Sequence, residues 1–242
     1  MPILKTADAS IYYEVHGDGR PLLLLPPGGM DASISFWGRT AFDPLKVLAG
    51  DFTLIALDER NSGQSAGDLA AGDPWDVYAR DHLALLDHLG LDRVHVLGCC
   101  IGSSHALRLA RVAPQRVVSM VLEQPVGRSL DNQELLAHSW APWAARMAAN
   151  PPGHDARQVE DFARRMWQGD FVLSVSRDDV HRCATPMLVL PGVDPYHPTA
   201  IGDEIVSLAP HATVLHGWKS SPESTAQAVA AIREFIRRQV AG

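Results

Sequence analysis

Short apolar runs alternate with amphipathic stretches along most of the chain. Six runs are apolar enough to form buried strands: residues 22–25, 52–57, 94–97, 117–122, 187–190 and 212–215. Three stretches place apolar side chains on one helical face: residues 74–89, 103–112 and 223–240. Strands that alternate with such helices are typical of βαβ units, so the pattern predicts an α/β protein with a mostly parallel central sheet flanked by helices.

Local signals place the first hairpin and one helix. Residues 11–15 and 22–25 flank a turn rich in glycine, which predicts an antiparallel strand pair near the start of the chain. Asp73 and Pro74 fit the N-cap and first position of a helix, and Gly90 follows its expected end.

The alternation of strand-like and helix-like stretches stops between residues 126 and 185. This segment has three tryptophans and two helical patterns: Trp140, Trp143, Trp167 and residues 133–149 and 156–168. It contains no convincing strand, so we expect a helical lid inserted into a core domain made of residues 1–125 and 186–242. The tryptophans suit plain packing within the lid as well as the lining of an apolar pocket.

The stretch Gly98-Cys99-Cys100-Ile101-Gly102 stands between a predicted strand and a predicted helix. A strand, a Gly-x-nucleophile-x-Gly turn and a helix form a nucleophile elbow, in which the glycines avoid collisions as the chain reverses. The middle residue is strained and its side chain rises above the sheet edge. The pattern therefore predicts that the turn presents the thiol of Cys100. The alternative is a small buried cysteine on a tight turn.

With this elbow, the chain resembles the α/β-hydrolase family over almost its whole length. Three further segments carry the resemblance: residues 11–29 (IYYEVHGDGRPLLLLPPGG), 57–65 (LDERNSGQS) and 186–198 (PMLVLPGVDPYHP). They are similar to the family's opening hairpin with its oxyanion loop, its Asp-x-Arg-Gly-x-Gly-x-Ser loop, and its acid-bearing strand and loop. Asn61 replaces a glycine in the second segment. The resemblance implies the α/β-hydrolase fold, with Asp194 as the catalytic acid.

The resemblance also implies nucleophilic acyl transfer, in which the Cys100 sulfur attacks a carbonyl and forms a thioester. The backbone N–H groups of Ile101 and Gly29 would stabilise the oxyanion. Gly28 and Gly29 also fit a simple turn after two prolines. We therefore expect a hydrolase, without a cofactor, that acts on an ester, lactone or thioester.

Three alternatives remain open for the base. The family carries its histidine in the loop after the last strand, where residues 218–220 of this chain read Trp-Lys-Ser. His216 lies just before this position and is the first candidate. His197, close to Asp194, is the second, and a site with no histidine base is the third. A thiolate needs less help from a base than a serine hydroxyl does.

The other histidines are expected to pack rather than react. His82 and His88 are six positions apart in a predicted helix, a spacing that does not stack two metal ligands, and His105 is expected on the helix behind the elbow. The three cysteines lack zinc-site spacing, and a disulfide between Cys99 and Cys100 would be strained. No metal site is predicted.

The charge and composition of the chain limit the classes of molecule that it is expected to bind. The 242 residues carry a formal net charge of −7 with scattered basic residues, which argues against nucleic acid or an anionic membrane surface. The longest apolar run is too short to cross a bilayer, and no secretory signal is visible. We expect a cytoplasmic monomer or homodimer that acts on a small molecule with an apolar part.

Two rival functions stay open beside hydrolysis. A member without the usual histidine segment could bind a small ligand under its lid without turnover. The same scaffold could also transfer an acyl group to an acceptor other than water, or carry lyase-type chemistry.

Overall fold

The computed structural model describes residues 2–69, 72–149, 155–169 and 171–239. A nine-stranded sheet has the order β1-β2-β4-β3-β6-β7-β8-β9, with β5 paired to β2. The strands are β1 Ile3–Lys5, β2 Ala9–His16, β3 Arg20–Leu25, β4 Phe52–Leu57, β5 Ala66–Gly67, β6 Val94–Cys99, β7 Val117–Glu123, β8 Met187–Leu190 and β9 Ala212–Val214. From β4 to β9 along this order all neighbours are parallel, which confirms the predicted mostly parallel sheet.

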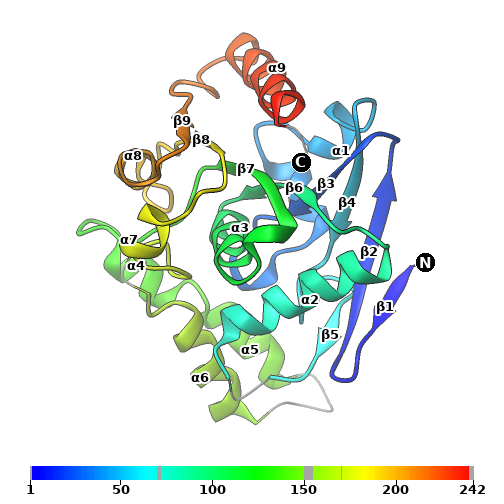
Figure 1. The fold of residues 1–242 in the computed structure, drawn as a ribbon. Helices are drawn as coiled ribbons and strands as arrows, with labels where there is room; N and C mark the ends of the chain where they lie inside the picture. Colours follow the sequence, from blue (N-terminus) through cyan, green and yellow to red (C-terminus); the bar gives the residue numbers. More distant parts are fainter. Residues whose placement is uncertain (1, 70–71, 150–154, 170, 240–242) are drawn as a thin grey trace.

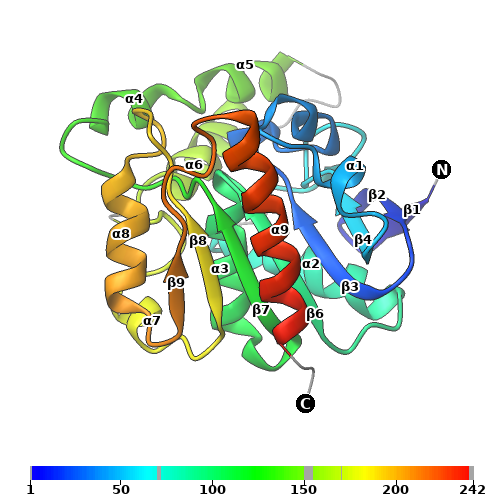
Figure 2. The same ribbon diagram turned by 90° about the horizontal axis from the view of Figure 1, so that it is seen from above.

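Helices cover both faces of this sheet (Figures 1 and 2). The α-helices are α1 Pro44–Val47, α2 Pro74–His88, α3 Ile101–Val112, α4 Gln133–His138, α5 Ala141–Ala149, α6 Ala156–Met166, α7 Arg177–His181, α8 Thr199–Leu208 and α9 Pro222–Arg238. Three short 3₁₀ helices are η1 Gly29–Asp31, η2 Ile34–Arg39 and η3 Pro114–Arg116. Apolar residues of α2, α3 and α8 pack in one core cluster, and those of α9 pack in another.

Strand β3 shows why the buried strands read as unbroken apolar runs. Leu23 and Leu25 pack in the cluster beneath α2 and α3, whereas Leu22 and Leu24 pack in the cluster beneath α9. All four side chains are fully buried. A strand covered on both faces needs an apolar residue at every position.

The predicted hairpin between residues 11–15 and 22–25 is wrong. Strand β2 pairs antiparallel with β4, and β3 pairs parallel with β4 and β6, so β4 separates β2 from β3. The glycine-rich connection between β2 and β3 passes over the residues that precede β4 and does not close a hairpin. At Gly17, which has φ +76°, a Cβ would lie only 2.2 Å from the carbonyl oxygen of Ala49.

The helices α4 to α7 all lie between β7 and β8, and the structure describes no strand within residues 126–185. Figure 2 shows α4, α5 and α6 across one end of the sheet. Trp143 of α5 and Phe162 of α6 pack in one apolar cluster with Ile101, the first residue of α3. These helices therefore cover the end of the sheet at which β6 gives way to α3.

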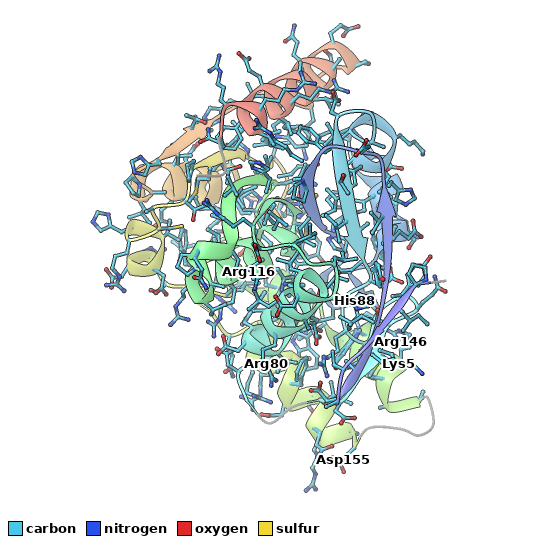
Figure 3. All side chains as sticks on the ribbon, turned by 45° about the vertical axis from the view of Figure 1, so that its right-hand side comes forward. Lys5, Arg80, His88, Arg116, Arg146 and Asp155 are labelled. Atoms are coloured by element: carbon cyan, nitrogen blue, oxygen red, sulfur yellow. The ribbon has the colours of Figure 1, made fainter. Side chains whose placement is uncertain are left out.

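Charged side chains such as Lys5, Arg80 and Asp155 point outward from the molecule (Figure 3). Among the described helices, none combines the length and the apolar character needed to cross a membrane.

Candidate active site

Strand β6 enters the predicted sharp turn and α3 leaves it. Cys100 has φ 57° and ψ −119°, a strained conformation for a residue with a side chain. A Cβ on Gly98 would lie 2.2 Å from the carbonyl oxygen of Gly102, and a Cβ on Gly102 would lie 2.0 Å from that of Leu25. Both positions therefore require glycine if the chain is to reverse here.

Three groups interact with the sulfur of Cys100. Burial alone raises the pKa of the thiol, but the neighbouring imidazole of His197 and the backbone N–H groups of Ile101 and Gly28 lower it below its usual value. Cys100 stays partly exposed, between the cluster beneath α9 and the cluster beneath the helical segment. A thiolate held in this way is a better nucleophile than a free cysteine at neutral pH.

The imidazole of His197 joins Cys100 to Asp194. Its Nδ1 lies 2.8 Å from Oδ1 and 3.0 Å from Oδ2 of Asp194. Burial lowers the pKa of His197, yet the charge of Cys100 and the charge and hydrogen bond of Asp194 raise it to about 9. Nε2 has no hydrogen bond of ordinary geometry within the described part of the chain, so the imidazole acts on the sulfur mainly through charge.

Asp194 and His197 come from one short loop after β8. The backbone N–H of His197 donates to Oδ1 of Asp194, so the loop closes on the carboxylate. Burial raises the pKa of Asp194, and the opposing hydrogen bonds from His197 together with the charge of Lys219 lower it below its usual value. The carboxylate therefore stays charged and orients the imidazole.

The structure does not bring His216 to Cys100. Its Nε2 lies 3.2 Å from Oδ1 of Asp203 on α8, and about half of its side chain is exposed (55%). The prediction that ranked His216 ahead of His197 is therefore corrected. The next loop residues take other places: Trp218 is buried and donates from Nε1 to the carbonyl oxygen of Pro191 at 2.8 Å.

Lys219 occupies the loop position at which the histidine was expected. Its Nζ donates to Oε1 of Gln124 and lies 3.8 Å from Oδ2 of Asp194. A lysine ammonium has no acceptor lone pair, so it cannot accept a proton as a histidine base does. The imidazole next to Cys100 comes instead from the loop that also carries Asp194.

One of the two backbone N–H groups next to the sulfur differs from the pair expected as oxyanion donors, Ile101 and Gly29. The N–H that points to the sulfur with that of Ile101 belongs to Gly28, not to Gly29. Gly28 has φ +129°, and a Cβ there would lie 3.0 Å from the Cα of Ala32. Gly29 instead begins η1, where a Cβ would lie 3.6 Å from the Trp167 ring.

Polar contacts hold this oxyanion loop. Ser62 donates to the carbonyl oxygen of Met30 at 2.8 Å, and Asp58 accepts hydrogen bonds from the backbone N–H groups of Ile34 and Gln64. Asn61 adopts φ 63°, in the left-handed region that favours glycine. This explains why the α/β-hydrolase pattern has a glycine at this position. Asp58 thus connects the loops around the site.

Sequence reasoning missed Glu123, the last residue of β7. Its side chain is fully buried and neither carboxylate oxygen has a hydrogen-bond partner in the described structure. Burial raises its pKa to about 8. The neighbouring backbone joins it to the site, because the N–H of Cys100 donates to its carbonyl oxygen at 2.9 Å. The sequence signal for this residue was a carboxylate directly after the apolar run at residues 117–122.

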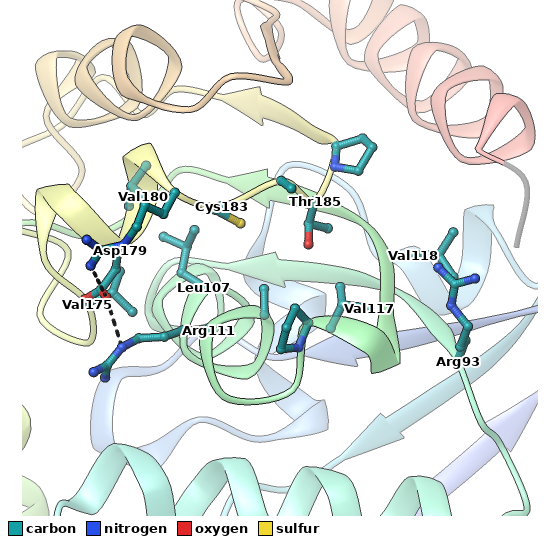
Figure 4. A pocket seen from close by; sticks show the side chains of 15 residues that line it. Arg93, Leu107, Arg111, Val117, Val118, Val175, Asp179, Val180, Cys183 and Thr185 are labelled. Carbon is teal, nitrogen blue, oxygen red and sulfur yellow. Dashed lines mark ion pairs between the residues drawn. The ribbon is translucent and has the colours of Figure 1, made fainter. Parts of the chain in front are cut away.

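The surroundings of the thiol are apolar on the side of the helical segment. Ile101 packs with buried aromatic and aliphatic residues: Met30, Trp75, Tyr78, Trp143, Phe162 and Trp167. A cavity of about 580 Å³ lies at the other end of the sheet, near the start of β7 (Figure 4). It is lined by Leu107, Val117 and Cys183 and does not reach the elbow residues.

Known proteins similar to this chain agree with the geometry. A sequence profile described as alpha/beta hydrolase fold matches residues 21–181. “Putative carbamate hydrolase RutD” of Azorhizobium caulinodans is 34% identical over 122 residues, 50% of this chain and 43% of that protein. The “dihydrolipoyllysine-residue acetyltransferase component of acetoin cleaving system” of Pseudomonas putida is 34% identical over 163 residues, 63% of this chain and 42% of that protein. The chain thus spans less than half the length of these relatives.

Solved structures extend the likeness to the whole chain. A meta-cleavage product hydrolase from Pseudomonas fluorescens IP01 has a TM-score of 0.72 and 18% identity, and the match covers 95% of this chain and 94% of that one. Est816, described as an N-acyl homoserine lactone degrading enzyme, has a TM-score of 0.71 and 21% identity, with 97% and 100% covered. At these identities the likeness establishes the fold.

Proposed function

Because the chain belongs to the alpha/beta hydrolase fold family, we propose that it is a cofactor-independent enzyme that cleaves an ester, lactone or thioester with Cys100 as nucleophile. The observation that carries this proposal is the meeting of a thiol, an imidazole and two backbone N–H groups at one point. His197 is the proposed base and Asp194 the residue that orients it.

The proposed reaction begins when the sulfur of Cys100 bonds to the carbonyl carbon and the carbonyl electron pair moves to the oxygen. The N–H groups of Gly28 and Ile101 donate hydrogen bonds to this oxyanion. As the carbonyl reforms, the leaving group departs with the proton of His197 and a thioester remains on Cys100. Water then attacks the thioester while His197 accepts its proton, and the acid and the thiolate are released.

The apolar cluster around Ile101 supports a substrate with an apolar acyl part, and we propose that residues 126–185 act as the lid over it. The names of two relatives agree with a carbonyl substrate, since a carbamate and a lactone both present an acyl carbonyl.

Acyl transfer is the second candidate. One relative is named as an acetyltransferase component, and Cys100 is only partly exposed between two apolar clusters, which limits access of water to a thioester. An added thiol, amine or alcohol would then release the acyl group faster than water does.

The test is a panel of p-nitrophenyl esters and thioesters with acyl chains of increasing length. We expect a burst of p-nitrophenol, an acyl adduct on Cys100 by mass spectrometry, and loss of both in Cys100→Ala. Cys183→Ala, which removes another partly exposed thiol, is the matched control and should behave as wild type. Turnover that survives in Cys100→Ala, or a wild type without adduct or turnover on the whole panel, contradicts the proposal.

A further inference from the structure

Three ligating side chains meet in the core outside the proposed catalytic site. Glu59 follows β4, His82 lies in the middle of α2, and His105 lies on α3 one turn beyond the elbow. One ligand atom from each lies within 4.8 Å of the other two. The side chains are almost completely buried, with 2%, 0% and 2% of their surface exposed.

The contacts inside this cluster are incomplete. Nε2 of His82 lies 3.0 and 2.9 Å from the two carboxylate oxygens of Glu59, so these two side chains form a pair. His105 faces this pair, with its ring centre 5.5 Å from that of His82. Nδ1 of His105 and Nδ1 of His82 have no hydrogen-bond partner in the described part of the chain. A buried imidazole nitrogen without a partner is uncommon and calls for a ligand.

The surroundings exclude bulk water and leave negative charge. The rings of Trp75 and Tyr78 each lie 4.9 Å from the ring of His105. Beside the cluster, the guanidinium of Arg60 is bound by the carboxylates of Asp81 and Asp8. These two carboxylates exceed the charge of the guanidinium by one, and Glu59, which pairs with His82, adds a further carboxylate whose charge a divalent cation would neutralise.

We propose that Glu59, His82 and His105 form a buried site for a divalent transition metal, with Zn²⁺ as the expected ion. Two imidazole nitrogens and one carboxylate oxygen are a ligand set that zinc uses in proteins. Bonds of about 2.0–2.2 Å require ligand atoms roughly 3–3.5 Å apart, so a pair at the 4.8 Å limit would need to approach by roughly 1.3–1.8 Å.

The site joins three elements that build the catalytic end of the molecule. The metal would connect the loop after β4, which carries Asp58 and the contacts to the oxyanion loop, with α2 and with α3 directly behind Cys100. Because the ligands are closed off from solvent, the ion would enter while the chain folds, and its binding free energy would add to stability.

The experiment measures metal in the folded chain and does not depend on activity. Wild type is unfolded, refolded with excess Zn²⁺ or Co²⁺, gel-filtered and analysed by plasma mass spectrometry. We expect about one ion per chain in wild type and in His88→Gln, an exposed histidine on the same helix. His105→Gln and His82→Gln should each retain at least tenfold less metal. Zn²⁺ should raise the melting temperature of wild type but not that of either glutamine variant.

Cobalt identifies the ligands. A complex with nitrogen and oxygen ligands lacks the intense near-ultraviolet band of thiolate-bound cobalt, so such a band would assign the metal to cysteine and overturn the proposal. A refolded wild type with less than a tenth of an equivalent of either ion overturns it too. Where the glutamine variants fail to refold, the wild-type stoichiometry and cobalt spectrum decide.

Discussion

His197 and Cys100 shift each other's protonation in opposite directions. The imidazole lowers the pKa of the thiol, although burial opposes this, and the thiol and Asp194 raise the pKa of the imidazole to about 9. A raised histidine pKa stabilises the folded chain fully below the ordinary imidazole pKa, and this contribution is lost as the pH rises through about 9. The two shifts have opposite signs, so each charged group favours the charged form of the other.

Replacing the imidazole tests this ion pair. In His197→Gln the alkylation of Cys100 by iodoacetamide at pH 7 should slow at least tenfold, because the thiolate loses its cation, and its pH profile should move to higher pH. Mass spectrometry of the labelled peptide over time measures the rate. His216→Gln should react like wild type, since His216 pairs with Asp203. Equal effects of the two variants would contradict the placement of the base.

Glu123 gives a pH dependence of stability. Burial raises its pKa from 4.5 to about 8, so folding takes up a proton between these pH values and stability falls as the pH rises through them. Glu123→Gln should remove this loss, which amounts to roughly 2–4 kcal/mol between pH 5 and 8.5. Urea unfolding at both pH values measures it. Glu134→Gln, on the exposed side of α4, should keep the wild-type slope; a wild type as stable at pH 8.5 as at pH 5 would refute the assignment.

At the scale of elements, the alternation of strands and helices followed from the sequence because it depends on local pattern. The partners of β2 did not, because a short glycine-rich connection permits either a hairpin or a crossing over β4, and long-range packing decides between them. The same limit explains why the sequence did not identify which histidine lies next to Cys100. His216 and His197 both lie in loops near the sheet edge, and only the fold shows that the second loop closes on Asp194.

The elbow is the element whose shape most constrains its sequence. Gly102→Ala places a methyl group 2.0 Å from the carbonyl oxygen of Leu25, a backbone atom that cannot move aside. We expect a loss of about 2–3 kcal/mol and a melting temperature lower by roughly 5–10 °C. Gly50→Ala, where a Cβ meets nothing within 4 Å, should change neither by much. Calorimetry of both variants measures the difference, and an unchanged melting temperature in Gly102→Ala would show that α3 can shift away from β3.

At the scale of the whole molecule, Cys100 lies where two apolar clusters meet. One belongs to the sheet face beneath α9, and the other joins the start of α3 to the helices of the inserted segment. Under the proposed function, the sheet would hold Cys100 rigidly and the inserted helices would select the substrate. Such a division permits the substrate to change without rebuilding the elbow.

Trp167 tests this division. It is buried in the inserted segment, and its ring lies 3.6 Å from the place that a Cβ of Gly29 would occupy. Trp167→Phe leaves space beside the oxyanion loop, so the ratio of kcat/KM for long to short acyl esters should rise about tenfold, within the range that one buried aromatic edge supplies. Leu130→Ala, 89% exposed in the same segment, should leave the ratio unchanged. If Trp167→Phe instead lowers kcat/KM equally for esters of all acyl lengths, the segment supports folding and does not select the substrate. The lid assignment then fails, whereas the proposal for Cys100 stands.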